Sequence, residues 1–140
     1  MDNSKAGSGS EPEIIERSRA YWSQRAKEYS ALHDASRHQE LRDAFRKLLR
    51  GFMPRDKGPH GQRRTRALDV GCGSGFMSLI LAELGCDVTA VDFSRDMLDE
   101  AKRNAARAGA ASIEFVQADV QRLAFEEGSF DMAVSRNVLW

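Results

Sequence analysis

The chain has 140 residues, 41% of them hydrophobic and 30% charged, which suffices for one domain with a single core. Its 21 Lys and Arg residues balance its 21 Asp and Glu residues, so no global electrostatic field draws it to nucleic acid or to an anionic membrane. No apolar run approaches the ~18 residues of a transmembrane helix. Together with the charge balance, this predicts neither a nucleic-acid nor a membrane partner.

The first part of the chain is predicted to be mostly helical. Residues 1–12 are rich in Ser and Gly and lack a signal-peptide core, which indicates a flexible leader. Residues 13–53 form an N-terminal helical segment with two predicted helices, one over 13–29 and one ending near Phe52. Residues 54–65, rich in Pro and Gly, are predicted to be a linker loop.

Short apolar strands alternate with helices in the remaining residues, 66–140. The predicted helices cover 76–84 and 95–108, and the predicted strands cover 66–70, 87–91, 112–117 and 131–135. This alternation predicts an α/β fold with a parallel, Rossmann-like sheet, right-handed crossovers and helices on both faces. The two N-terminal helices precede this sheet.

The most informative motif follows the first predicted strand and reads Asp69-Val70-Gly71-Cys72-Gly73-Ser74-Gly75. Glycines at alternate positions allow the backbone to turn sharply, to take positive φ and to approach a ligand closely. In open α/β sheets, a strand, a loop of this kind and a helix hold nucleotide-like cofactors beyond the carboxyl ends of the strands.

Acidic residues stand at three successive strand ends. Asp69, Asp92 and Asp119 close the first, second and third predicted strands. Carboxyl ends of parallel strands share one edge of a sheet, so the three carboxylates are expected to line one crevice. Each of them alone is as readily a cap or turn residue, and only their register with the glycine loop indicates a site.

The two cysteines, Cys72 and Cys86, have no metal-binding spacing and no secretory context. Reduced thiols in a cytoplasmic protein are therefore expected, and no metal site is predicted.

Two cofactors compete for this crevice. A dinucleotide would place its pyrophosphate against the loop and the following helix N-terminus, where Asp69 would repel it. At ~4 Å two like charges cost ~1 kcal/mol in water and ~4 kcal/mol at an effective dielectric near 20. S-adenosyl-L-methionine has no phosphate and carries cationic groups that a carboxylate attracts. The dinucleotide fingerprint is Gly-x-Gly-x-x-Gly, whereas the glycines here alternate, so S-adenosyl-L-methionine is favoured. Asp92 suits either cofactor, because a carboxylate at that strand end accepts ribose hydroxyls.

Four sequence blocks, 68–75, 91–98, 117–120 and 128–135, resemble the class I S-adenosylmethionine-dependent methyltransferases of the methyltransferase type 11, or UbiE-like, branch. They occur in the order and at the spacing of that family. The resemblance implies that the cofactor is bound by Tyr29, Asp69, Gly71, Gly73, Gly75, Asp92, Phe93, Met97, Asp119, Val120 and Arg136.

In that family the three glycines would follow the methionine part of the cofactor, with Asp69 near its amino group and Tyr29 near its carboxylate. The resemblance places the ribose at Asp92. It implies that Phe93 and Met97 pack by the adenine, that Asp119 accepts a hydrogen bond from the adenine amino group and that the Val120 backbone N–H meets the ring. Residues 135–137 would cover the cofactor and face the methyl acceptor.

The function implied is methyl transfer to a small-molecule acceptor. Such a transfer mainly requires that nucleophile and methyl be aligned in a dry site, and no catalytic residue is identified. No Asn-Pro-Pro-Tyr-like motif follows the fourth strand, which argues against amino-methylation of nucleic acid. A non-catalytic S-adenosylmethionine-binding module and a nicotinamide-dependent oxidoreductase remain the alternatives.

The family's sheet has seven strands, and four are predicted here. We therefore expect a chain truncated after the fourth strand, carrying the cofactor-binding half of a methyltransferase in residues 66–140. Its fourth strand would lie at an edge of the sheet, and an uncovered edge seeks a partner. Homodimerisation or strand exchange through residues 131–135 is expected.

Overall fold

The computed structural model describes residues 10–32, 38–54 and 63–137. Most of the predicted leader, most of the predicted linker and residues 138–140 lie outside these ranges. In chain order the elements are α1 (Glu11–Leu32), α2 (Gln39–Phe52), β1 (Arg66–Val70), α3 (Phe76–Glu83), β2 (Asp87–Asp92), α4 (Arg95–Ala108), β3 (Ile113–Gln117), the 3₁₀ turn η1 (Val120–Arg122) and β4 (Met132–Ser135).

The four strands form one parallel sheet in the order β3-β2-β1-β4. The predicted α/β class and the parallel, Rossmann-like sheet are confirmed. Val70, at the end of β1, lies opposite Val91 of β2 and Ser135 of β4. The carboxyl ends of these strands therefore meet at one edge, and the loops that follow them share one end of the domain.

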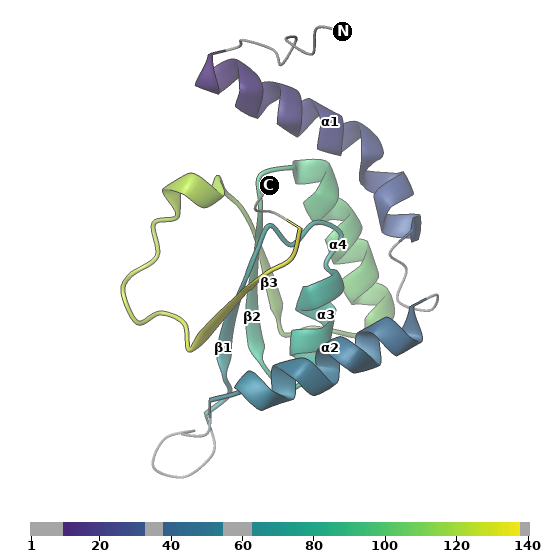
Figure 1. Cartoon of the computed structure of the whole chain (residues 1–140), viewed down its shortest axis with the longest axis vertical. Helices are drawn as coiled ribbons and strands as arrows, with labels where there is room; N and C mark the ends of the chain where they lie inside the picture. Colours follow the sequence, from purple (N-terminus) through teal and green to yellow (C-terminus); the bar gives the residue numbers. More distant parts are fainter. Residues whose placement is uncertain (1–9, 33–37, 55–62, 138–140) are drawn as a thin grey trace, which may run out of the picture.

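Helices α2, α3 and α4 cover one face of this sheet, and α1 runs along α4 at the carboxyl ends of the strands (Figure 1). On this face one row of residues, Ala67, Val88, Ile113 and Met132, packs in the same core cluster as α3. On the other side runs the connection from β3 to β4 (Figure 1).

Helices were expected on both faces of the sheet. In the described residues they cover one face. Between β3 and β4 the only helical turn in this described segment is η1. Residues 123–130 carry no apolar stripe of helical period, and Gly128 takes a left-handed φ of 75° there.

Helix α3 explains why residues 76–83 are apolar on nearly all sides. One side of α3 packs on the sheet, and α2 covers another, with the rings of Phe45 and Phe76 in edge-to-face contact at 5.9 Å. Ile80 and Leu81 are fully buried between these layers. A helix enclosed from both sides needs no polar stripe.

Helix α4 has the two ends that its sequence predicts. Ser94 is the N-cap, and its hydroxyl accepts a hydrogen bond from the Met97 backbone N–H at 3.3 Å. Gly109 ends the helix with φ of 67°, in the left-handed conformation that glycine adopts at least cost. Helix α1 begins at Glu11, two residues before the expected start of the helical segment.

Asp131 fixes β4 beside β1. Its carboxylate accepts the backbone N–H of Arg66 and a guanidinium N–H of Arg63, both at 2.8 Å, and its own N–H donates to the Arg66 carbonyl at 2.8 Å. These bonds hold the pKa of the Asp131 carboxyl well below its usual range, chiefly through Arg63 and Arg66. The register of the edge strand is therefore tied to one ionised side chain.

Replacing Asp131 by Asn should lower the free energy of unfolding by about 1–2 kcal/mol at pH 7, because the backbone and guanidinium donors lose an ionised acceptor. The folded-state pKa lies below the unfolded one, so this stabilisation is present above about pH 4 and is lost as the pH falls below it. Urea unfolding from pH 7 to pH 3 measures the gap between variant and wild type.

The control is Asp87→Asn, which removes a carboxylate that pairs with Arg64 where both side chains are more than half exposed. It should cost under about 0.5 kcal/mol. If the difference in free energy of unfolding between wild type and Asp131→Asn grew as the pH fell, the stabilising role of the ionised Asp131 carboxylate would be contradicted.

Candidate functional site

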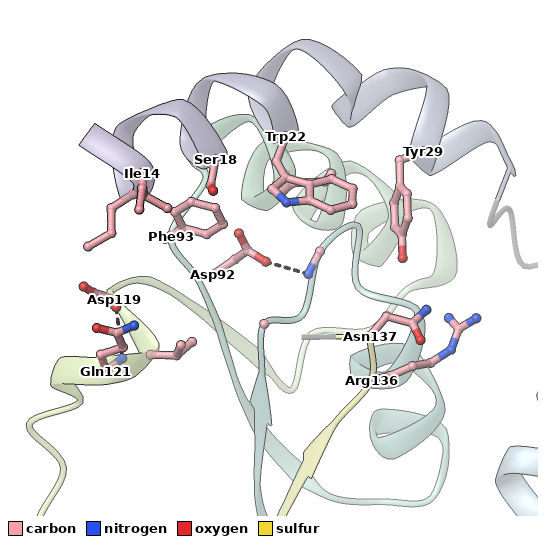
Figure 2. Close-up of a pocket in the computed structure, with 15 residues that line it drawn as sticks. Ile14, Ser18, Trp22, Tyr29, Asp92, Phe93, Asp119, Gln121, Arg136 and Asn137 are labelled. Atoms are coloured by element: carbon pink, nitrogen blue, oxygen red, sulfur yellow. Dashed lines mark hydrogen bonds between the residues drawn. The ribbon is translucent and has the colours of Figure 1, made fainter. Parts of the chain in front are cut away.

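A cavity of about 350 Å³ lies at the carboxyl ends of the strands, between the glycine loop, α1, η1 and the end of β4 (Figure 2). It brings together nine of the eleven residues predicted from the sequence, namely Tyr29, Gly71, Gly73, Asp92, Phe93, Met97, Asp119, Val120 and Arg136. The remaining wall is formed by Ile14, Ile15, Ser18, Trp22, Gln121 and Asn137.

The glycine loop follows β1 with three left-handed residues, since φ is 68° at Gly71, 53° at Gly73 and 88° at Gly75. A side chain at Gly73 would face the Tyr29 ring 3.5 Å from the added Cβ, inside the cavity wall. At Gly75 the added Cβ would lie 3.2 Å from the Ala101 Cβ of α4. Gly75 therefore lets the loop pack on α4, and it does not line the cavity.

Asp92, at the end of β2, joins the loop to α4. One carboxylate oxygen accepts the Gly73 N–H at 2.8 Å, and the other accepts the Ser94 N–H at 2.9 Å (Figure 2 draws the first of these). Burial raises the pKa of the Asp92 carboxyl, and the backbone donors oppose that rise. A carboxylate offers about four lone-pair sites, so each oxygen can accept one further bond from a ligand.

This structural role of Asp92 was missed by the sequence reasoning. Its signal was present, because Asp92 stands two residues before a helix N-cap, where short acidic side chains bond nearby backbone N–H groups.

Asp69 lies behind the glycine loop and does not line the cavity. It shares the sheet face of Ala67, so its side chain points toward α3, where the Ser78 hydroxyl donates to it at 2.5 Å. The side chain is almost completely buried. Burial raises the pKa of the Asp69 carboxyl to about 6, outweighing the opposing bond from Ser78. Its position at a strand end predicted that Asp69 lines the cavity. Because side chains alternate between the two faces of a strand, the Asp69 side chain instead points toward α3.

Helix α1 forms the outer wall with residues spaced along one face, including Ser18, Trp22 and Tyr29 (Figure 2). The rings of Trp22 and Tyr29 meet edge to face at 5.7 Å. Polar contacts hold α1 in place, with the Ser23 and Ser94 hydroxyls 3.2 Å apart.

One side chain joins α1 to both the loop and α4. The Asn104 amide of α4 donates to the Ser30 hydroxyl of α1 at 3.1 Å and to the Ser74 carbonyl of the loop at 2.9 Å. Few apolar residues of α1 are buried, so the amino-acid pattern indicates this wall only weakly.

The two ends of the cavity differ chemically (Figure 2). At one end Phe93 faces η1, where Asp119 accepts the Gln121 backbone N–H at 2.9 Å. At the other end the Tyr29 hydroxyl points toward the Arg136 and Asn137 side chains. Asp92 and the glycine loop lie between the two ends.

A parallel α/β sheet with a positive-φ glycine loop over a cavity at its carboxyl edge defines a Rossmann-like cofactor-binding domain. The family model described as a methyltransferase domain matches residues 67–140. The chain therefore belongs to this methyltransferase family, within the class I S-adenosylmethionine-dependent methyltransferases.

Relatives of known name agree with this family. A ubiquinone biosynthesis O-methyltransferase from Methylocella silvestris is 34% identical over 114 residues, which are 79% of this chain and 44% of that protein. A malonyl-[acyl-carrier protein] O-methyltransferase from Enterobacter lignolyticus is 35% identical over 98 residues, 70% of this chain and 35% of that protein. The chain thus spans less than half the length of these relatives.

Among solved structures, one from Methanococcus maripaludis is described as an assigned S-adenosyl-L-methionine-dependent methyltransferase. It superposes with a TM-score of 0.65 at 25% identity and covers 83% of this chain and 50% of that one. A protein from Pyrococcus horikoshii gives a TM-score of 0.59 at 28% identity, covering 72% and 43%. No helix in the described part of the chain is long and apolar enough to cross a membrane.

The raised pKa of Asp69 predicts a pH-dependent stability. Between the ordinary pKa of 3.8 and the folded value of about 6, the folded chain holds a proton that the unfolded chain has lost. Stability therefore falls as the pH rises through this interval, by up to ~3 kcal/mol for a shift of about two units, and is level above it.

The Asp69→Asn variant removes this titration. The amide changes the free energy of unfolding by an amount that does not depend on pH. The difference in this free energy between the variant and wild type should therefore shift in favour of the variant from pH 4.5 to pH 7. Chemical denaturation at several pH values measures the difference, and parallel curves would show that the Asp69 carboxyl titrates normally.

Proposed function

We propose that this chain binds S-adenosyl-L-methionine in the cavity at the carboxyl edge of the sheet, as the cofactor-binding part of a small-molecule methyltransferase. The observation that carries the proposal is the meeting of the glycine loop, the Asp92 carboxylate and the Asp119 carboxylate around one cavity. The cytoplasmic location expected from the sequence stays a prediction.

The nucleoside would occupy the end formed by β2 and η1. The free lone pairs of Asp92 would accept the ribose hydroxyls, and Phe93 and Met97 would pack against the adenine ring. Asp119 and the Val120 backbone would meet the polar edge of that ring. All five residues line the cavity.

The methionine part would run over Gly71 and Gly73 toward Tyr29. The two glycines lack side chains where the ligand would lie closest to the backbone. Asp69, although behind the loop, contributes negative charge when ionised, which favours a cationic ligand. Gly75 serves the packing of the loop on α4, and Arg136 closes the cavity at the methionine end.

The same charges disfavour a dinucleotide. Its pyrophosphate would meet two carboxylates in the wall, Asp92 and Asp119, with Asp69 behind it. Like charges in a partly buried site repel by several kcal/mol at ~4 Å. A nicotinamide-dependent oxidoreductase is therefore the weaker reading of this site.

When bound, S-adenosyl-L-methionine supplies a methyl group activated by its sulfonium. The described residues orient and enclose it: the glycine loop sets its path, Asp92 holds the ribose and α1 excludes water from one side. Methyl transfer needs this alignment more than it needs a proton acceptor, and no general base is assigned. O-methyltransferases among the relatives support a small-molecule acceptor.

Replacing Asp92 by Asn should weaken S-adenosylhomocysteine binding about 10–100-fold, because charge-assisted bonds to the ribose are lost. Isothermal titration calorimetry measures the affinity. Since Asp92 also supports the loop, the analogue lacking both ribose hydroxyls is titrated in parallel. Its affinity should be low for wild type and should barely change in the variant.

The control is Cys72→Ser, in the same loop, whose side chain packs with Ala90 and Leu98 away from the cavity. It should bind S-adenosylhomocysteine like wild type. Equal S-adenosylhomocysteine affinity in wild type and Asp92→Asn would remove the ribose assignment.

We also propose that β4 mediates self-association. In the described sheet β4 pairs only with β1, so its outer edge presents unpaired backbone groups. Light scattering should then detect dimers at high concentration. Ala133→Lys adds a charge at an exposed position of this strand and should shift the equilibrium to monomer. A wild-type chain that stays monomeric throughout would refute the proposal.

A further inference from the structure

Trp22 of α1 is the largest of the side chains that line the cavity. Among the described residues it belongs to neither of the two apolar core clusters. The buried residues of α1, which packs on α4, are instead the small Ala26 and Ser30. The half-buried Trp22 ring therefore contributes its surface to the cavity rather than to an apolar core.

Two neighbouring rings restrict the orientation of the Trp22 ring. The Tyr29 ring meets it edge to face at 5.7 Å, and the Tyr21 ring does so at 5.2 Å. Edge-to-face pairs of this kind are favourable beyond the surface that they bury. The indole is thus held in the cavity wall before any ligand binds.

Along the cavity, the Trp22 ring lies between the two chemically different ends (Figure 2). On one side, the Ser23 hydroxyl lies 3.2 Å from that of Ser94, whose backbone N–H donates to the Asp92 carboxylate. On the other side, the Tyr29 ring lies against the glycine loop. Trp22 therefore faces the part of the cavity between Asp92 and Tyr29.

We propose that the Trp22 ring packs against the sulfonium of S-adenosyl-L-methionine and makes the cavity prefer the methylated cofactor to its demethylated product. This rests on the proposed function, which puts the ribose at Asp92 and directs the methionine part toward Tyr29. The sulfur of the cofactor joins these two parts. A sulfonium neither donates nor accepts a hydrogen bond, and an aromatic face, best of all that of Trp, stabilises such a cation.

Methyl transfer removes this attraction. The bond between the methyl carbon and sulfur breaks, its electron pair stays on sulfur, and S-adenosylhomocysteine is left with a neutral thioether. The product then keeps only the apolar contact with the ring and loses the cation–π contact. Trp22 thereby favours the exchange of product for fresh cofactor.

Isothermal titration calorimetry of S-adenosyl-L-methionine and S-adenosylhomocysteine with wild type and Trp22 variants tests the proposal. The measured quantity is the ratio of the two dissociation constants in each protein. Trp22→Leu should lower the preference for S-adenosyl-L-methionine about 3–30-fold, the range that corresponds to one cation–π contact. Trp22→Phe keeps a ring that attracts cations less strongly, so its ratio should fall between those of wild type and Trp22→Leu.

A merely structural role of Trp22 gives a different result. Loosening of α1 would weaken the binding of both ligands by the same factor and leave the ratio unchanged. An unchanged ratio in Trp22→Leu therefore overturns the proposal. Circular dichroism checks that each variant folds, and Trp22→Met, which also lacks a ring, takes the place of Trp22→Leu if that variant does not fold.

The matched control is Phe52→Leu, which removes a ring that is 71% exposed on α2 and does not line the cavity. Its ratio should equal that of wild type. If wild type binds neither adenosyl ligand, the proposed function fails and the role of Trp22 falls with it. If wild type binds both and the Trp22 variants keep its ratio, only the role of Trp22 is overturned.

Discussion

The cavity depends above all on the two hydrogen bonds that the Asp92 carboxylate accepts from the Gly73 and Ser94 N–H groups. The loop after β1 has three left-handed glycines, and its Cys72 side chain packs on Ala90 of β2 and Leu98 of α4. Its shape is therefore set from outside. One buried carboxylate at the end of the adjacent strand holds the loop and starts α4, so the floor of the cavity and the end of β2 form one unit.

A second layer of constraints adds α1 to this unit. The Asn104 side chain of α4 bonds both Ser30 of α1 and the Ser74 carbonyl of the loop. The outer wall is thus attached by polar contacts at its edges, while the apolar core lies beneath, between the sheet and α3. Polar attachment of this kind gives a wall that can open at a lower cost than the core can. Under the proposed function, the cofactor would enter and leave past this wall.

The sequence predicted the parallel sheet and its strand boundaries closely, because each strand is a short apolar run ended by a glycine or a polar turn. It also predicted the caps of α4, since Ser94 and Gly109 have conformational preferences that tertiary contacts here do not override. Strand-end positions correctly placed Asp92 and Asp119 in the cavity wall.

Three features required the structure. The burial of Asp69 follows from which face of β1 packs on α3, and that choice depends on contacts with residues distant in sequence. The wall from α1 was only partly foreseen, because its few buried residues leave a weak amphipathic pattern and its position depends on α4. The stacking of Arg136 on Phe45 and Phe76 joins three segments, and no local pattern predicts it.

The central claim is that the cavity at the carboxyl edge of the sheet is an S-adenosyl-L-methionine site. Amide chemical-shift mapping of the isotope-labelled chain with S-adenosylhomocysteine tests it most directly. The largest changes are predicted at Gly71, Gly73, Phe93 and Val120, with α2 residues such as Gly51 unaffected. Changes at these amides with NAD but none with S-adenosylhomocysteine would contradict the account.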